Sequence, residues 1–159
     1  YTATKMTQRA TTTLMKIRAL SKSDYAQWRE LWDQYLVFYN HTLEENQTQL
    51  TFGRLTSANP EIHCLVVEVY SKLIGFAHSS FTHSTWSKNK ELYLEDLFVD
   101  PTHRGVGAGR ALIEAVAKFG GDLGAKKLFW QTHKDNEIAQ KLYASLATKS
   151  EFVIYEKRI

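Results

Sequence analysis

Residues 92–110 read LYLEDLFVDPTHRGVGAGR, and this stretch decides the fold. Its first part, Leu92–Val99, is rich in apolar and aromatic residues and stops at Asp100-Pro101. This pattern predicts a strand, because proline cannot donate to a sheet ladder. Three glycines follow, and apolar residues then recur with helical spacing over residues 111–119, up to Gly120-Gly121. The stretch therefore predicts a strand, a glycine-rich loop and a helix that ends at the glycine pair.

The loop Arg104–Arg110 (RGVGAGR) lies directly between the predicted strand and the predicted helix. Glycines let the backbone turn tightly and bring N–H groups against a phosphate, and the positive end of a helix dipole favours an anion. A Walker loop is excluded because no Gly-Lys-Ser/Thr follows. A dinucleotide-binding loop is disfavoured because the spacing G-x-G-x-x-G is absent and the unit lies late in the chain. The readings that remain are a cradle for the pyrophosphate of coenzyme A and a plain tight turn before a helix.

Apolar periodicity predicts an antiparallel meander before this stretch, and one further helix with two strands after it. Ser21 and Asp24 have the spacing of a helix-start capping box. The polar pair Ser71-Lys72 has the length of a hairpin loop. The expected strands cover residues 14–20, 62–70, 73–81, 92–99, 127–131 and 152–157, and the expected helices begin near 22 and cover 44–55, 111–119 and 136–146. The chain is therefore expected to be a mixed α/β protein whose antiparallel strands pass into a β-α-β unit.

The composition is that of one globular domain. The chain has 159 residues, of which 43% are hydrophobic and 23% charged, close to globular averages. A net charge of +3 is too small for a nucleic-acid footprint, and no apolar run is long enough to cross a membrane. A single cysteine excludes an internal disulfide. We expect a cytoplasmic domain over residues 14–159, with residues 1–13 as a disordered leader or as an extension before a natural start at Met15.

The loop also carries a family resemblance. Arg104-x-x-Gly107-x-Gly109 matches the R/Q-x-x-G-x-G/A signature of the GNAT superfamily of N-acetyltransferases. Leu92–Val99 (LYLEDLFV) resembles the spermidine/spermine and thialysine acetyltransferase branch, and residues 38–54 look more like the fungal histone and polyamine acetyltransferase branch. The resemblance covers roughly residues 17–159. It implies the GNAT fold, in which splayed parallel strands open a V-shaped slot.

The resemblance implies acetyl-CoA as co-substrate. Backbone groups of the strand end would bind the pantetheine arm, the loop would hold the pyrophosphate, and the start of the helix over 136–146 would line the far side of the arm. The implied cofactor-binding residues are Leu97, Phe98, Val99, Arg104, Gly105, Val106, Gly107, Ala108, Gly109, Arg110, Asn136 and Ala139.

Two residues are implied as catalytic. An alkylamine with a pKa of about 10.4 is protonated at neutral pH, so a base must assist its deprotonation. The resemblance assigns this task to Glu95, with an ordered water, and assigns protonation of the departing thiolate to Tyr143. The alternatives are that Glu95 only pairs with a basic neighbour or binds the amine electrostatically, and that Tyr143 is a core residue. Strand alternation places Asp96 on the opposite face from Glu95 unless a bulge intervenes.

The resemblance also implies residues that bind the acceptor. Phe38 and Tyr39 lie where the polyamine enzymes carry an aromatic residue followed by an acid, and here the acid is missing. Phe129, Trp130 and Gln131 match another stretch that contacts substrate; Trp130 offers either a cation-π face or core packing. No histidine or cysteine has the spacing of metal ligands, so no metal is expected, and Cys64 is expected to be a small core residue.

We therefore expect an N-acetyltransferase that transfers acetyl directly to a small-molecule amine: a polyamine, a thialysine-like compound or an amino acid. A protein or peptide lysine acetyltransferase is the first alternative, and a non-catalytic coenzyme A sensor is the second. Family members commonly dimerise, so a homodimer is expected. We expect no nucleic-acid or membrane partner.

Overall fold

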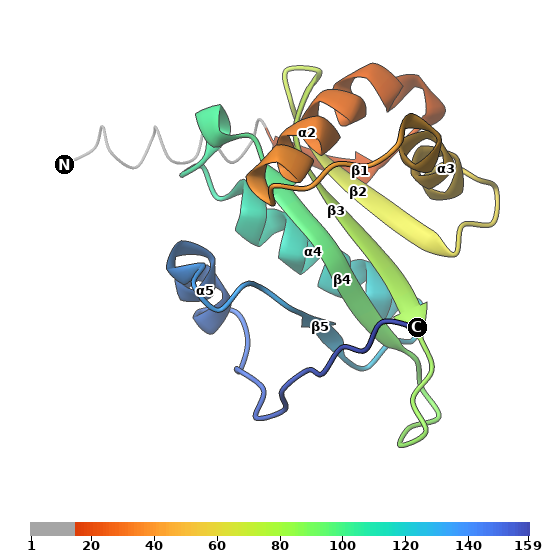
Figure 1. Ribbon diagram of the computed structural model, residues 1–159, viewed down its shortest axis with the longest axis vertical. Coiled ribbons are helices and arrows are strands. Elements are labelled where there is room, and N and C mark those ends of the chain that lie inside the picture. The colour runs from red at the N-terminus through yellow and green to blue at the C-terminus, as the bar shows by residue number, and fades with distance from the viewer. Residues whose placement is uncertain (1–14) are drawn as a thin grey trace.

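The computed structural model describes residues 15–159, which form one five-stranded sheet with helices on both faces (Figure 1). Strands lie in chain order, β1 to β5; the first four pair antiparallel, and β4 pairs parallel with β5. The mixed α/β fold is therefore confirmed, while the predicted leader, residues 1–13, lies outside the described residues. The elements are β1 (Met15–Ala19), η1 (Lys22–Asp24), α2 (Tyr25–Phe38), α3 (Glu45–Leu55), β2 (Ile62–Val69), β3 (Lys72–Thr82), β4 (Glu91–Val99), η2 (Pro101–His103), α4 (Ala108–Asp122), β5 (Leu128–Trp130) and α5 (Glu137–Ala144).

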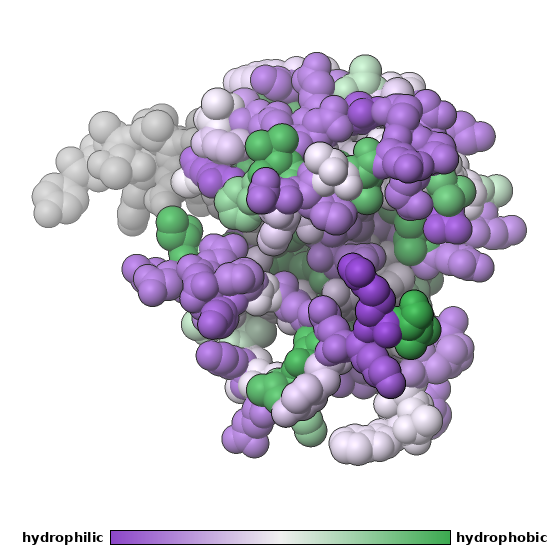
Figure 2. Space-filling model, in the orientation of Figure 1, coloured by the Kyte–Doolittle hydropathy of each residue, from purple (hydrophilic) through white to green (hydrophobic). Residues whose placement is uncertain are grey.

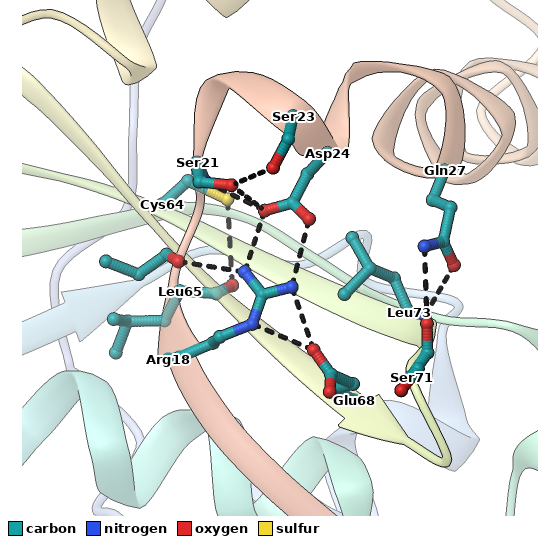
Figure 3. Close-up of polar contacts among 11 residues, drawn as sticks. Arg18, Ser21, Ser23, Asp24, Gln27, Cys64, Leu65, Glu68, Ser71 and Leu73 are labelled. Atoms are coloured by element: carbon teal, nitrogen blue, oxygen red, sulfur yellow. Dashed lines mark hydrogen bonds and ion pairs between the residues drawn. The ribbon is translucent and has the colours of Figure 1, made fainter.

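The first helix is tied to the sheet by a charged cluster, shown in Figure 3. Arg18 on β1 donates to both carboxylate oxygens of Asp24, at 2.7 and 2.9 Å, and to Glu68 on β2 at 2.8 Å. The backbone N–H of Ser21 donates to Asp24 at 2.8 Å, which confirms the predicted capping interaction at the start of the helical segment. The cluster fixes where α2 leaves β1.

The hairpin between β2 and β3 turns one residue earlier than predicted. Val69 pairs with Lys72, so the loop is Tyr70-Ser71 and not Ser71-Lys72. Both loop residues have positive φ, 48° and 63°, as a two-residue type I′ turn requires. The sequence does not signal this turn, because neither residue is the glycine or asparagine that usually marks it.

Two apolar cores lie on opposite faces of the sheet. Helices α2 and α3 cover one face around the fully buried Trp28 and Phe76, and α4 covers the other face around Leu92, Leu112 and Val116. Burying side chains of this size contributes about 1.5–3 kcal/mol each. The sheet therefore forms the middle layer of three. The site lies along the part of β4 that does not pair with β5.

Helix α4 continues through Gly120-Gly121 to Asp122, so the predicted stop at the glycine pair is wrong. A Cβ on Gly120 would lie 2.6 Å from Cδ2 of Leu92, which shows that this glycine allows close packing of helix on sheet. The residue with positive φ just past the helix end is Gly124, at 90°.

The predicted strand over residues 152–157 does not form. No strand follows α5 in the described part of the chain, and Phe152, Val153, Ile154 and Tyr155 are exposed. The last strand, β5, is also shorter than predicted, with three residues instead of 127–131. A strand needs a hydrogen-bonding partner, which an apolar pattern alone does not supply. None of the helices described between residues 15 and 159 is long and apolar enough to span a bilayer.

Candidate active site

A slot opens where β4 and β5 separate. The two strands pair over only three positions, from Leu92 with Leu128 to Leu94 with Trp130. In the space-filling view this face is hollowed near its middle, below α2 (Figure 2). The enclosed part of the slot is about 20 Å³, enough for one water molecule. Its walls are Tyr35 and Tyr39 from α2, Leu94, Glu95 and Leu97 from β4, Trp130 and Gln131 at the end of β5, and Tyr143 from α5.

A β-bulge at Glu95 shapes the slot. Leu94 pairs with Ser79 and Asp96 pairs with His78, so Glu95 has no partner on β3. The extra residue reverses the alternation of β4: Leu94 and Leu97 both face the α4 core, and Asp96 turns toward α2. The bulge that could bring both acids to one slot is present, yet only Glu95 lines the slot, while Asp96 lies behind it and binds Tyr35.

The position of Glu95 favours a basic carboxylate. Glu95 lines the slot as an exposed residue, and partial burial of its carboxyl raises the pKa, which the charge of Asp96 raises further. A raised pKa makes a carboxylate a stronger base. Glu95 is therefore suited to accept a proton in the slot.

Tyr143 reaches the slot from the opposite element. Its ring packs edge-to-face on Trp130, with centroids 5.4 Å apart at 71°. Its hydroxyl forms no hydrogen bond with any residue from 15 to 159, and burial raises its pKa. The phenol therefore stays protonated at neutral pH and has its proton available for a ligand. Trp130 serves here as the packing partner of Tyr143.

The glycine-rich loop has the backbone expected of an anion cradle. Gly105 and Gly107 have φ of 85° and 83°, and the space above both is open. Gly107 is the N-cap of α4, so the first N–H groups of the helix point out of its end. Arg110 donates to the Ser145 hydroxyl at 2.7 Å, which ties the start of α4 to the end of α5.

Backbone groups at the end of β4 face the slot. The N–H of Asp100 donates to Ile74 on β3 at 2.8 Å, whereas the carbonyl of Val99 accepts from Arg104 on the other side at 3.3 Å. The backbone N–H and C=O groups of successive residues point to opposite sides of a strand. Those of Leu97 and Val99 therefore point toward the slot. Phe98 instead faces β3, and its side chain is buried in the core beneath α2.

Asn136 holds the start of α5. Its side-chain oxygen accepts from the N–H of Ala139 at 3.3 Å, and its amide donates to Thr132 at 3.4 Å. Asn136 is thus the N-cap of the helix that carries Tyr143. The expected contact of Asn136 and Ala139 with a ligand stays a prediction.

The residues expected to bind the acceptor divide into two groups. Tyr39, Trp130 and Gln131 line the slot with Glu95. Phe38 is 55% exposed, with the guanidinium of Arg104 at 6.0 Å from its ring centre, and Phe129 stacks on Tyr93 at 5.1 Å. Phe38 and Phe129 are therefore not part of the slot wall.

Tyr35 on α2 was not among the residues predicted for the site. Tyr35 lies one turn before Tyr39, and this i, i+4 spacing was the available signal. Its hydroxyl donates to Asp96 at 2.6 Å. Behind this pair, His78 bonds the other oxygen of Asp96 at 2.9 Å, and Trp28 donates to His78 at 3.1 Å.

No three His, Cys, Asp or Glu side chains converge as metal ligands within residues 15–159. The expectation that no metal takes part stays a prediction.

Comparison with known proteins places this geometry in a family. A family model described as the acetyltransferase (GNAT) family matches residues 20–147. The D-amino-acid N-acetyltransferase HPA3 of Saccharomyces cerevisiae is 29% identical over 89% of each chain. The thialysine N-epsilon-acetyltransferase of Bos taurus is 35% identical over 57% of each chain. The resemblance to both branches is thus confirmed.

The fold also matches solved structures. The aminoglycoside N-acetyltransferase AAC(6')-Iy, in complex with the bisubstrate analogue CoA-S-monomethyl-acetylneamine, superposes with a TM-score of 0.77. The two chains are 24% identical, and the match covers 91% of this chain and 99% of the other. At this identity the likeness supports the fold.

Proposed function

From the premise that the chain belongs to the acetyltransferase (GNAT) family and is an N-acetyltransferase, we propose that it transfers acetyl from acetyl-CoA directly to the primary amine of a small molecule. One observation carries the proposal: the slot places a carboxylate suited to accept a proton, Glu95, and a phenol free to donate one, Tyr143, on different elements around one narrow space. The names of the relatives support a small acceptor, since they are acetyltransferases of D-amino acids and of thialysine.

The chain fits the coenzyme. The open backbone at Gly105 and Gly107 and the N-terminus of α4 offer N–H groups to a pyrophosphate, and Arg104 and Arg110 add positive charge. The backbone of Leu97 and Val99 would bind the pantetheine arm as an added strand would. Acetyl-CoA supplies the acetyl group as a thioester.

The residues of the slot divide the proton transfers between them. Glu95, through one water, accepts the proton that the ammonium must lose before its nitrogen can attack. As the C–N bond forms and the C–S bond breaks, the Tyr143 hydroxyl gives its proton to the departing sulfur. The attacking nitrogen loses its second proton to water, and water returns a proton to the Tyr143 phenolate. Cys64 supplies no competing nucleophile, because it is buried in the core and burial raises the pKa of its thiol.

The residues that line the slot favour a cationic amine. Tyr35, Tyr39 and Trp130 present aromatic walls, and Glu95 lies among them. Aromatic faces and a carboxylate attract an alkylammonium group. We propose an amino-acid, thialysine-like or polyamine acceptor, acetylated in the cytoplasm by a homodimer. A coenzyme A sensor would need neither Glu95 nor Tyr143.

The test is acetyl-CoA consumption with a panel of lysine, thialysine, D-amino acids, spermidine, an aminoglycoside and a histone-tail peptide. We expect turnover with at least one small amine, and a large loss of that turnover in Glu95→Gln and in Tyr143→Phe. Turnover with the peptide alone would favour the protein acetyltransferase. Tight binding of acetyl-CoA with no turnover on any amine would favour the sensor.

A further inference from the structure

A buried chain of hydrogen bonds behind the slot takes no part in the steps proposed above. It runs from Trp28 on α2 through His78 on β3 and Asp96 on β4 back to Tyr35 on α2, with links of 3.1, 2.9 and 2.6 Å. Trp28 is fully buried, His78 is 4% exposed, and the Asp96 side chain is 15% exposed. A buried polar group without a hydrogen bond is costly, whereas a buried chain in which every group is hydrogen-bonded is rigid.

The chemistry of the four groups fixes the direction of each proton. An indole N–H is a donor only, so Nε2 of His78 must accept from Trp28 and carry no proton. Nδ1 of His78 therefore carries the proton of the neutral ring and donates it to Oδ2 of Asp96. Oδ1 of Asp96 accepts the hydroxyl proton of Tyr35.

Tyr35 has only one hydroxyl proton, and its hydrogen bond to Asp96 uses this proton. Toward the slot, the Tyr35 oxygen can then only accept a hydrogen bond. The contrast with Tyr143 is complete, since the Tyr143 hydroxyl has no partner among residues 15–159 and keeps its proton for a ligand. Among these groups of the slot, Tyr35 and Glu95 are acceptors and Tyr143 is a donor, whereas the Tyr39 hydroxyl and the Gln131 amide, which also line the slot, can either donate or accept.

We propose that the oxygen of Tyr35 accepts an N–H of the acceptor amine, and that Asp96, His78 and Trp28 are positioning residues that fix the Tyr35 proton away from the slot. A neutral primary amine has two N–H groups and one lone pair. With one N–H on Tyr35 and the other directed to Glu95 or its water, the lone pair is left to point at the acetyl carbon. This inference rests on the proposed function and assigns the residue that orients its acceptor.

Replacing Tyr35 tests the contact. Tyr35→Phe should lower kcat/KM for the amine found in the panel about tenfold, as the loss of one hydrogen bond predicts, with the affinity for acetyl-CoA unchanged. The matched control is Tyr25→Phe, which removes a hydroxyl from the same helix at the far contact with Glu45 and should leave kcat/KM unchanged.

Replacing Asp96 tests the direction of the proton. In Asp96→Asn the amide oxygen must face the Nδ1 proton of His78, so the amide NH2 faces Tyr35 and the Tyr35 proton turns into the slot. This proton would point at an N–H of the amine, and two donors repel each other. Asp96→Asn should therefore lower kcat/KM more than Tyr35→Phe does. Adding Tyr35→Phe to Asp96→Asn should then restore kcat/KM to the level of Tyr35→Phe alone. A purely structural role predicts no such recovery.

A nitrogen-15 NMR measurement of His78 tests the chain without activity. We expect the tautomer with the proton on Nδ1, and the opposite tautomer would overturn the inference. An active parent enzyme whose Tyr35→Phe variant keeps full kcat/KM would also overturn it, and would leave the proposed function standing. A panel in which the parent acetylates no amine removes the proposed function and this inference with it.

Discussion

A methyl group on Gly75 would lie 2.6 Å from the backbone carbonyl oxygen of Phe98. Gly75 stands on β3 opposite Val99, at the end of β4 whose backbone faces the slot. Only a residue without a side chain lets the two strands come together here. The same glycine therefore serves both the sheet and the geometry of the site.

We predict that Gly75→Ala lowers the free energy of unfolding by about 1–3 kcal/mol, because the backbone it meets cannot rotate aside. The control is Gly53→Ala in the last turn of α3, where a methyl meets nothing within 4 Å. That variant should gain about 0.5–1 kcal/mol, since alanine favours a helix over glycine. Urea unfolding measures both, and equal values would contradict the packing argument.

Acid should weaken the cluster around Asp24. The guanidinium of Arg18 lowers the pKa of Asp24 to about 2, against about 3.9 in an unfolded chain. Between these values the unfolded state holds a proton that the folded state does not. The contribution of this pair is thus fully present above about pH 4 and lost as the pH falls through about 2.

We predict that Asp24→Asn is less stable than the parent at pH 6 and shows a flatter fall in unfolding free energy between about pH 4 and pH 2. Asp122→Asn is the control, because Asp122 makes only an exposed ion pair with Lys118. Denaturation at a series of pH values gives both slopes. A parallel acid slope in Asp24→Asn and the parent would show that the pair carries no pH dependence.

Local patterns predicted most elements of this fold, and apart from the β2–β3 turn the failures depend on distant contacts. The capping residues Ser21 and Asp24 and the loop before α4 act through neighbours in sequence, so their structure was predictable. The end of α4 and the missing last strand depend on partners far along the chain. Gly120 packs on Leu92, and residues 152–157 find no strand to pair with.

The residues of the site also fall into those that could be predicted and those that could not. The resemblance supplied Glu95 and Tyr143, and the structure brings both to one slot. The helical spacing places Tyr35 one turn before Tyr39, but the contact of Tyr35 with Asp96 could not be predicted, because the direction of Asp96 depends on the bulge beside it. A bulge is set by the pairing of two whole strands, which no short motif encodes.

The division between binding and chemistry gives a further prediction. Gly107→Asp should weaken acetyl-CoA binding strongly, because it places a carboxylate against the pyrophosphate and forces a side chain onto a φ of 83°. Glu95→Gln should leave binding nearly unchanged and lower turnover. Gly121→Asp, on the open side of the same helix, controls for the added charge. Calorimetric titration with acetyl-CoA measures all three, and equal losses for Gly107→Asp and Glu95→Gln would contradict the assignment.

Tyr143→Phe is expected to keep the affinity for acetyl-CoA while lowering turnover by about 10- to 1,000-fold, the range of a lost general acid. The ring that packs on Trp130 remains, so the wall of the slot survives and only the proton is removed. Steady-state rates would understate the loss wherever product release limits turnover, so the decisive measurement is the single-turnover rate of acetyl transfer. The hydroxyl makes no hydrogen bond within residues 15–159, which means its removal leaves no buried partner unsatisfied and the melting temperature should stay the same. A single-turnover rate equal to that of the parent would assign the proton to water and leave Tyr143 as a wall of the slot.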